Sequence, residues 1–582
     1  MKNLKIKIIS KYLRPYKKEL IIGAISLLIV NIFSVIIPLE VKNIIDELQV
    51  GFSSTFIITK SLWLILLASL MAIIRLSSRQ IVFGIGRKVE VNLRQKIFDH
   101  LLMQDPDWVQ KKGSGDIISR ATSDVENVRR LLGFTVLSLC NIVLAYSLTI
   151  PSMFLINKML TISALMIFPI ILGIVGLFGG KMVNQRKLQQ ESLSKLSDLI
   201  QEDLSGISSI KIYSQEESEK KEFSKINNSY RDAAIKLART ASTLFPLLQG
   251  ISSISLLLLL SIGSSQLQNG FITIGGLIAL ILYVERLVFP TALLGFTLNT
   301  FQLGQVSLDR IEDILQSNPK ITNSPNSKVF KKKVKGAIEA KNLKIKYQGS
   351  KFNALDGINF KINPGELVAI VGPVGCGKTT LAKALGRTIE IDSQQIFIDG
   401  SDIKNIKLND LRKNIAIVPQ EAFLFTSSIS ENLRFGKPKA SRNLVKDSAV
   451  KAGLIEDVNS FPNGFETLVG ERGITLSGGQ RQRSALARAL LINAPVIVLD
   501  DALASVDNKT ASLIINQIRK NKKNTILMIS HQLAVAATCD RVLVMNKGKI
   551  VQEGLHKNLL RKKGLYKNLW ERELAVKSIE SN

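Results

Sequence analysis

The sequence predicts an all-α membrane domain of six helices, followed by an α/β domain with a phosphate-binding loop. Up to about residue 296, long apolar runs alternate with basic stretches. From about residue 331, short strand and helix patterns alternate as they do in soluble domains. The glycine-rich segment GPVGCGKTT lies in this second part, directly after an apolar strand. A chain of 582 residues is also too long for one core, so at least two domains are expected.

Six apolar segments in the first half are candidate membrane spans, because each approaches the length of about 20 residues that crosses a bilayer. They are residues 20–41, 56–81, 134–156, 160–181, 244–267 and 271–296. Ser, Gly and Asn occur within them, which suits helices that pack together or line a polar cavity. The expected organisation is a transmembrane domain at 1–317, a linker at 318–336, an α/β domain at 337–570 and a tail at 571–582.

The distribution of basic residues predicts the orientation of the spans. Lys and Arg are dense before the first span and in two long connections, residues 87–130 and 185–239, whereas the other connections are short and nearly uncharged. Basic loops stay on the cytoplasmic side. We therefore expect a multi-pass protein of the cell (inner) membrane, with both termini, the long loops and the soluble domain in the cytoplasm. The net charge of +30 agrees with this bias, and no recognition motif predicts nucleic-acid binding.

Charged residues inside the predicted spans usually have a functional reason, because burial of a charge in lipid is costly. Arg75 lies in the second span, and Glu285 and Arg286 lie near the middle of the sixth. Two interpretations stay open. Glu285 takes part in substrate binding or gating, or these helices project beyond the membrane and the charges lie in a water-filled vestibule or pair locally.

The segment GPVGCGKTT matches the phosphate-loop pattern GxxxxGK[ST]. It follows the strand ELVAIV and precedes the helical segment LAKALGR, which is the context that a P-loop requires. Glycines allow backbone N–H groups to surround phosphates, Lys378 adds a positive charge, and the Thr379 hydroxyl is a Mg²⁺ ligand. The predicted nucleotide-binding residues are Gly372, Pro373, Val374, Gly375, Cys376, Gly377, Lys378, Thr379 and Thr380.

Two further segments extend this site. Asp500 ends the apolar strand VIVLD, and in P-loop NTPases such a carboxylate holds Mg²⁺. The segment LSGGQRQR places Ser and two Gly before a helix, which is a second anion-binding helix N-terminus. The P-loop of the same chain does not need it. This indicates that ATP is held between two copies of the domain.

With IVPQ ending in Gln420 and ISHQL containing His531, the second half resembles the nucleotide-binding domain of ABC transporters. The six spans, the long loops and the segment SGDIISRATSDVENV resemble type IV ABC exporters, and bacterial multidrug-resistance-like half-transporters most of all. The resemblance implies a membrane all-α six-helix transmembrane domain fused to an α/β P-loop ABC nucleotide-binding domain. It implies ATP-driven export of a small amphipathic or lipid-like substrate across the lipid bilayer. An ATP-gated channel or a membrane-anchored regulator on the same fold is the alternative.

The resemblance also implies roles for single residues. Tyr347 would stack on adenine, and Asp501, His531 and Gln420 would serve catalysis. The Mg²⁺ ligands would be Thr379, Gln420 and Asp500. The signature residues that contact the nucleotide held by a partner's P-loop would be Ser477, Gly478, Gly479 and Gln480. Asp507 would lie at the dimer interface, and segments 111–119 and 211–223 would be the coupling helices.

Asp501 departs from the family pattern, which usually has Glu directly after the magnesium Asp. The shorter side chain withdraws the carboxylate by about one C–C bond, and a misplacement of about 1 Å costs about 100-fold in rate. The same substitution marks one subunit of heterodimeric exporters. We therefore expect a second ABC half-transporter as partner, which supplies the catalytic Glu. A homodimer in which Asp501 works slowly is the alternative, and the retained His531 favours it.

Overall fold

The computed structural model describes residues 9–580 except residues 52, 471, 472, 474, 507 and 520–523. The chain forms two compact units. The first contains Met1–Leu102 and Gly113–Ser317, and the second contains Met103–Lys112 and Asn318–Asn582. Residues 103–112 come from the first long connection between membrane helices, so the tip of that connection belongs to the second unit.

The first unit is helical throughout its described residues. It contains six stretches that are long and apolar enough to cross a membrane, which confirms the expected number of spans: Ile9–Gln49, Ser54–Met103, Ser114–Ile156, Lys158–Ser205, Glu216–Gln268 and Ile274–Leu315. Each exceeds the roughly 20 residues of a bilayer span, because the helices continue beyond their apolar parts.

Its helices are α2 (Lys17–Val50), α3 (Ser54–Met103), α5 (Ser114–Ser119), α6 (Val125–Arg130), α7 (Val136–Ile156), α8 (Lys158–Leu165), α9 (Phe168–Ser205), α10 (Ile207–Ile212), α11 (Glu216–Gln268) and α12 (Ile274–Leu315). A 3₁₀ turn at Arg14–Tyr16 precedes α2, and π-helical turns lie at Arg120–Asp124 and Leu131–Thr135. The two π-helical turns separate α5, α6 and α7 without ending the helical path.

The fourth membrane stretch contains a break that the hydropathy pattern did not predict. Helix α8 ends at Leu165, and α9 begins at Phe168 with Pro169 in its first turn. Proline has no N–H to donate to the carbonyl four residues earlier, and its ring collides with that carbonyl. The predicted span 160–181 is therefore two helices rather than one.

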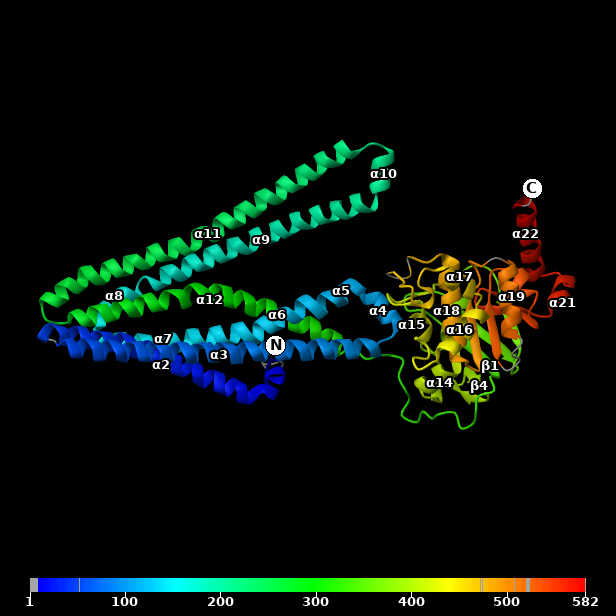
Figure 1. Cartoon of the computed structure of the whole chain (residues 1–582), viewed down its shortest axis with the longest axis horizontal. Helices are drawn as coiled ribbons and strands as arrows, with labels where there is room; N and C mark the ends of the chain where they lie inside the picture. The colour runs from blue at the N-terminus through cyan, green and yellow to red at the C-terminus, as the bar shows by residue number, and fades with distance from the viewer. Residues whose placement is uncertain are drawn as a thin grey trace. The chain divides into compact units, whose positions relative to one another are not determined.

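Helices α9 and α11 run beside each other, and α10 joins them at one end (Figure 1). The sequence placed a coupling helix at 211–223. In the structure the short helix α10 ends at Ile212, and a turn through Ser214, with a φ of +54°, leads into α11. Most of the expected segment is thus the start of α11. Its first turn carries Glu216, Glu217 and Glu219, acidic residues that stabilise a helix N-terminus.

In the first connection Gly113, Gly115 and Asp116 form a pattern typical of a tight turn. Gly113 has a φ of +79° and separates α4 (Pro106–Lys112) from α5, whereas Gly115 and Asp116 lie inside α5. The expected coupling segment 111–119 therefore covers the end of α4 and all of α5. These two helices belong to different compact units.

Close backbone approach and ion pairs hold α12 against the residues that precede α7. A Cβ atom at Gly304 would lie 2.5 Å from the Cβ of Leu131, so the helices meet there only because residue 304 lacks a side chain. Beside this contact, the Arg310 guanidinium pairs with Asp116 at 2.8 Å and with Asp124 at 3.3 Å. Arg120 joins the same network through Asp313 at 3.0 Å.

The second unit is built on two sheets. The larger has the order β10-β9-β3-β8-β7-β6, in which β10 is antiparallel and the other five strands are parallel. The smaller is antiparallel with the order β2-β1-β4-β5. The strands are β1 (Ile338–Ile345), β2 (Leu355–Ile362), β3 (Leu367–Val371), β4 (Ile396–Ile398), β5 (Ser401–Asp402), β6 (Ile415–Val418), β7 (Val496–Asp500), β8 (Thr525–Ile529), β9 (Arg541–Asn546) and β10 (Lys549–Gly554).

Strands β3, β7 and β8 are buried along their whole length, as expected for parallel strands with both faces covered. Alternate residues of β3 enter two different cores: Leu367 and Ala369 face one, and Val368 and Ile370 face the other. The helices of this unit are α4, α13 (Lys378–Leu385), α14 (Leu408–Asn414), α15 (Ile429–Arg434), α16 (Arg442–Lys451), α17 (Ile455–Ser460), α18 (Gly478–Ile492), α19 (Asn508–Arg519), α20 (Leu533–Ala536), α21 (His556–Arg561) and α22 (Leu565–Glu580).

We predict that Gly304→Ala lowers the melting temperature of the purified protein, because the new methyl group would force α12 away from Leu131. Overpacking of this kind costs about 1–3 kcal/mol. Gly84→Ala is the matched control, since Gly84 also lies inside a helix and a Cβ there would meet no atom within 4 Å. Equal melting temperatures for the two variants would contradict the tight contact.

Candidate nucleotide-binding site

The predicted site residues come together at the carboxyl ends of four neighbouring parallel strands. The P-loop follows β3, and Asp500 is the last residue of β7. Gln420 lies two residues beyond β6, and His531 lies two residues beyond β8. Parallel strands end at one edge of a sheet, where ligands of α/β folds bind. Segments far apart in the chain therefore meet at one place.

The P-loop is tightly folded around its backbone. Gly377 has a φ of +105°, and a Cβ there would lie 2.5 Å from the carbonyl oxygen of Ala354. The Lys378 ammonium is 5% exposed and donates hydrogen bonds to the carbonyl oxygens of Gly372, at 2.8 Å, and Pro373, at 2.9 Å. The cation is thus held over the loop in which phosphate binding is expected.

The remaining P-loop residues differ in exposure. Cys376 is buried, whereas Val374 at the tip of the loop is 89% exposed. Thr380 is buried, and its hydroxyl lies 3.3 Å from the Tyr347 hydroxyl. Tyr347, the residue expected to stack on adenine, is therefore fixed beside the start of α13.

Thr379 and Asp500 form a pair of hard oxygen ligands. The Thr379 hydroxyl donates to Asp500 Oδ1 at 3.3 Å. Burial raises the pKa of the Asp500 carboxyl, and the negative charge of neighbouring Asp501 raises it further, while the hydrogen bond from Thr379 lowers it. Two adjacent buried carboxylates favour a cation between or beside them, because a cation offsets the cost of burying both charges.

Asp501 is held in place from both sides. Its backbone N–H donates to the carbonyl oxygen of Ile529 at 2.9 Å, and its Oδ1 accepts from the backbone N–H of His531 at 3.4 Å. Its φ of +51° is a left-handed conformation that Asp adopts more readily than most residues. The side chain is 9% exposed. The carboxylate thus lies between the strand that carries Asp500 and the residue expected to contact the γ-phosphate.

The signature segment begins α18 with a capping box. The Ser477 hydroxyl accepts from the backbone N–H of Gln480 at 3.2 Å, and the Gln480 side chain accepts from the backbone N–H of Ser477 at 2.9 Å. Asp457 on α17 accepts hydrogen bonds from Gln480 and Arg483. Ser477 is exposed, and Gly478 and Gly479 are half-buried. The described residues show no hydrogen bond between this segment and the P-loop.

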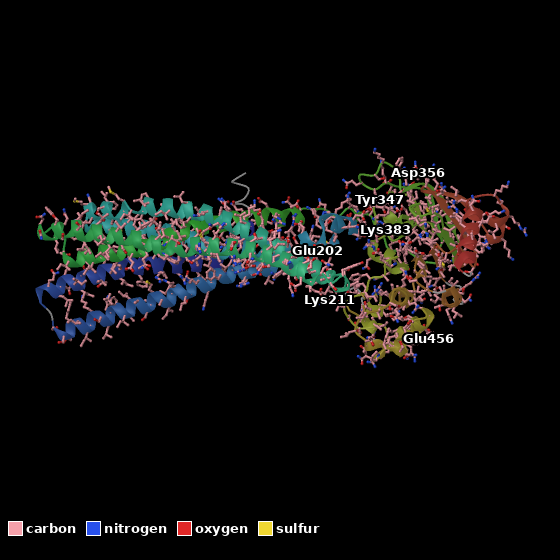
Figure 2. All side chains as sticks on the ribbon, turned by 90° about the horizontal axis from the view of Figure 1, so that it is seen from above. Glu202, Lys211, Tyr347, Asp356, Lys383 and Glu456 are labelled. Atoms are coloured by element: carbon pink, nitrogen blue, oxygen red, sulfur yellow. The ribbon has the colours of Figure 1, made fainter. Side chains whose placement is uncertain are left out.

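Figure 2 labels residues near each of these two segments of the second unit. Tyr347 and Lys383 lie in one part of the second unit, and Glu456, on α17, lies far from them. Because Asp457 on α17 holds the signature helix, the signature lies on the α17 side of this unit.

Gln482 is a site residue that the sequence motifs did not identify. This buried side chain donates to the carbonyl oxygen of Asp501 at 3.4 Å and accepts from the backbone N–H of Ser505 at 3.0 Å. It therefore ties the signature helix to the loop that follows β7. The sequence carries no clear signal for it, since Gln482 lies between Arg481 and Arg483, as an exposed helix residue would. Asp507, expected at a dimer interface, lies outside the described residues.

Helix α4 belongs to the second unit and is bound there next to Tyr347. The Lys111 ammonium donates to the side-chain oxygen of Gln348 at 2.8 Å. The Asp105 carboxylate, just ahead of α4, accepts the backbone N–H groups of Lys320 at 2.8 Å and Ile321 at 3.1 Å. The tip of the first connection is thus bound both to the residue after Tyr347 and to the chain that enters the second unit from α12.

Two family models match the chain, one to each part. A model of the ABC transporter transmembrane region matches residues 20–291, and a model of the ABC transporter matches residues 355–504. The second match contains the P-loop, the signature segment and Asp500.

Similar proteins cover nearly the whole chain. The multidrug resistance-like ATP-binding protein MdlA of Buchnera aphidicola is 34% identical over 94% of this chain and 95% of its own length. A probable multidrug resistance ABC transporter ATP-binding/permease protein of Bacillus subtilis, YheI, is 30% identical over 97% of this chain and 96% of its own. An ATP-dependent lipid A-core flippase of Idiomarina loihiensis is 29% identical over 94% of both chains.

Among solved structures, a bacterial Atm1-family ABC exporter with ATP bound matches 96% of this chain and 98% of its own, with a TM-score of 0.77 and 24% identity, which shows a shared fold. The membrane helices, the P-loop domain and these relatives all indicate the same family. The chain belongs to the ABC transporter family and is a multidrug-resistance-like exporter subunit, a multi-pass membrane protein that binds and hydrolyses ATP.

Proposed function

We propose that this chain is one half of an exporter that moves a small amphipathic or lipid-like substrate across the cell (inner) membrane. ATP is bound between its P-loop and the signature segment of a partner half-transporter. The observation that carries this proposal is the separation within one chain: the phosphate loop and the signature segment share no hydrogen bond among the described residues, and Ser477 is exposed. Two anion-binding helix N-termini that do not meet in one chain can meet across two.

Within this proposal each half of the dimer supplies a fixed set of groups. The P-loop backbone and Lys378 hold the phosphates, and Tyr347 stacks on the adenine of the same nucleotide. Gln420 and His531 face the terminal phosphate from the ends of β6 and β8. Ser477, Gly478, Gly479 and Gln480 contact the nucleotide in the partner's site. Closure around ATP would reach the membrane helices through α4, since this helix is bound beside Tyr347.

The residues present fit a Mg²⁺ ion, which would offset the charge of the ATP phosphates. Thr379 and Asp500 supply oxygen atoms at the end of β7, and Gln420 is exposed at the end of the neighbouring strand. Within the described part of the chain no cluster of three His, Cys, Asp or Glu side chains could hold a metal by itself. The phosphates of the nucleotide would complete the coordination, as they do in other P-loop sites.

Membrane orientation follows from the basic residues. The long helical extensions and the nucleotide-binding unit are placed on the cytoplasmic side, because Lys and Arg are dense in these segments. The connection between α2 and α3 and that between α11 and α12 are short and lie on the opposite side in this arrangement.

We propose further that the partner is a different half-transporter. The Asp501 carboxylate accepts a hydrogen bond from the backbone of His531 and is almost buried, so it lies back against the protein. A Glu at this position would extend the carboxylate by one methylene toward a water molecule beside the γ-phosphate. A partner with Glu after its magnesium Asp would use the intact signature of this chain and carry most of the hydrolysis.

Lys378→Ala is expected to weaken ATP binding at this chain's own site by more than about 100-fold and to stop transport, because a positioned charge at the phosphates is lost in a site shielded from water. ATP binding to the purified protein and ATP-dependent substrate transport in proteoliposomes measure the effect. Lys383→Ala is the matched control, since Lys383 lies on the same helix and is exposed. Normal transport by the Lys378→Ala protein would refute the assignment.

Asp501→Glu is expected to raise ATP hydrolysis at this chain's own site by up to about 100-fold, because the added methylene restores the reach of the carboxylate. The rate is measured in a purified complex whose partner site has been inactivated at its magnesium Asp, so that only this site contributes. Asp501→Asn is the control for charge, and its rate should stay at or below that of the unmodified protein. Unchanged activity in the Glu variant would show that residue 501 is not placed to act on water.

A further inference from the structure

A cavity of about 220 Å³ lies inside the first unit, between α2, α3, α7 and α12. Its lining includes three arginines: Arg75 and Arg79 on α3, and Arg286 on α12. Arg286 and Arg75 fall within predicted membrane spans, so the cavity places positive charge at membrane depth.

None of the residues that line this cavity is acidic. The acidic neighbour of Arg286 in sequence, Glu285, lines a different cavity, which is formed by α11 and α12. Within the described residues, none of the three arginines forms a salt bridge with Asp or Glu. A salt bridge between Glu285 and Arg286, one form of local pairing, is therefore absent among the described residues.

Arg286 is held rigidly but incompletely satisfied. Its Nη2 donates to the side-chain oxygen of Asn31 at 2.9 Å, and Asn31 in turn donates to the side-chain oxygen of Asn141 at 3.1 Å. Asn31 is 2% exposed, so this support is fixed by packing. The other terminal nitrogen, Nη1, is buried and has no hydrogen-bond partner. A buried guanidinium N–H without an acceptor is costly.

The hydrogen-bond partners of Arg75 among the described residues are neutral groups. Its Nη2 lies 3.5 Å from the Ser34 hydroxyl and 3.4 Å from the sulfur of Met71. Ser34 is one helical turn from Asn31, so α2 presents polar groups to Arg75 and Arg286 along one face. Charges in a membrane domain pair with opposite charges or line a polar path. Here none of the described residues supplies the opposite charge.

We propose that this cavity binds the anionic head group of the transported substrate, and that the substrate is an amphiphile with a phosphate-type head. A guanidinium fork matches the oxygens of a phosphate, which can accept from Arg286 Nη1 while Arg75 and Arg79 offset its charge. Apolar residues at the same cavity, Leu27, Val30 and Phe289, suit the adjoining hydrocarbon chain. This inference rests on the proposed export function and specifies its substrate class.

The test uses the purified full-length transporter without ATP. Binding of dodecyl phosphate and of dodecyltrimethylammonium is measured by equilibrium dialysis in a neutral detergent, so that only the head group differs. We expect dodecyl phosphate to bind at least about tenfold more tightly, since a charge-assisted hydrogen bond exceeds one tenfold step in affinity. Equal or tighter binding of the cation would overturn the proposal.

Variants locate the site. Arg286→Gln should weaken dodecyl phosphate binding at least about tenfold, because a buried unsatisfied donor at the cavity is removed. Arg286→Lys should recover part of the charge but not the two-pronged geometry. Arg186→Gln is the matched control: it removes a positive charge from an exposed position on α9 that does not line the cavity, and dodecyl phosphate should still bind in preference to the cation. Loss of that preference in Arg186→Gln but not in Arg286→Gln would refute the assignment.

Two further measurements separate the possible sources of the anion. Inorganic phosphate should not displace dodecyl phosphate at equal concentration; displacement would show a site for free phosphate and contradict an amphiphile. Dodecyl phosphate should also stimulate ATP hydrolysis, and binding without stimulation would show a resident lipid rather than cargo. Because binding is measured without ATP, failure of the head-group site leaves ATP-driven export standing, whereas normal transport by the Lys378→Ala protein would remove export and leave the binding result intact.

Discussion

Parallel pairing of β3, β8, β7 and β6 is the constraint on which the nucleotide site depends. It brings the P-loop, Asp500, His531 and Gln420 to one edge of the sheet, although they are spread over much of the second unit. The strands can pair this way because their apolar residues fill a core on each face. A polar substitution in β7 would therefore disturb the core and the position of Asp500 together.

Single side chains connect the nucleotide site to the neighbouring helices. Gln482 joins the signature helix to the loop after β7, so movement of α18 acts directly on the backbone of Asp501. Lys111 joins α4 to the residue after Tyr347, and Asp105 joins the same segment to the chain that follows α12. Nucleotide-dependent changes at either end of the site have a short route to segments that lead into membrane helices.

Each unit contains a positively charged side chain that forms no salt bridge among the described residues. In the P-loop, Lys378 is held by backbone carbonyl oxygens and is available for phosphate. In the membrane unit, Arg286 is held by Asn31 and keeps one buried N–H without an acceptor. Around α12 the Arg310, Asp116 and Asp124 charges satisfy one another and fix the helix instead. Charges that the chain compensates support the fold, and charges that it leaves uncompensated identify what each unit binds.

The sequence by itself determined the six spans, the P-loop and the strand that ends in Asp500, because each depends on local composition and spacing. The break at Pro169 was not readable from local rules, because other prolines of the membrane unit, Pro151 and Pro290 among them, lie inside helices that continue past them. Only the tertiary structure decided that Glu285 and Arg286 line different cavities, since neighbours on a helix point in different directions. It also decided the role of Gln482 and the docking of α4 beside Tyr347, because these contacts join residues that are distant in sequence, and local spacing carries no information about them.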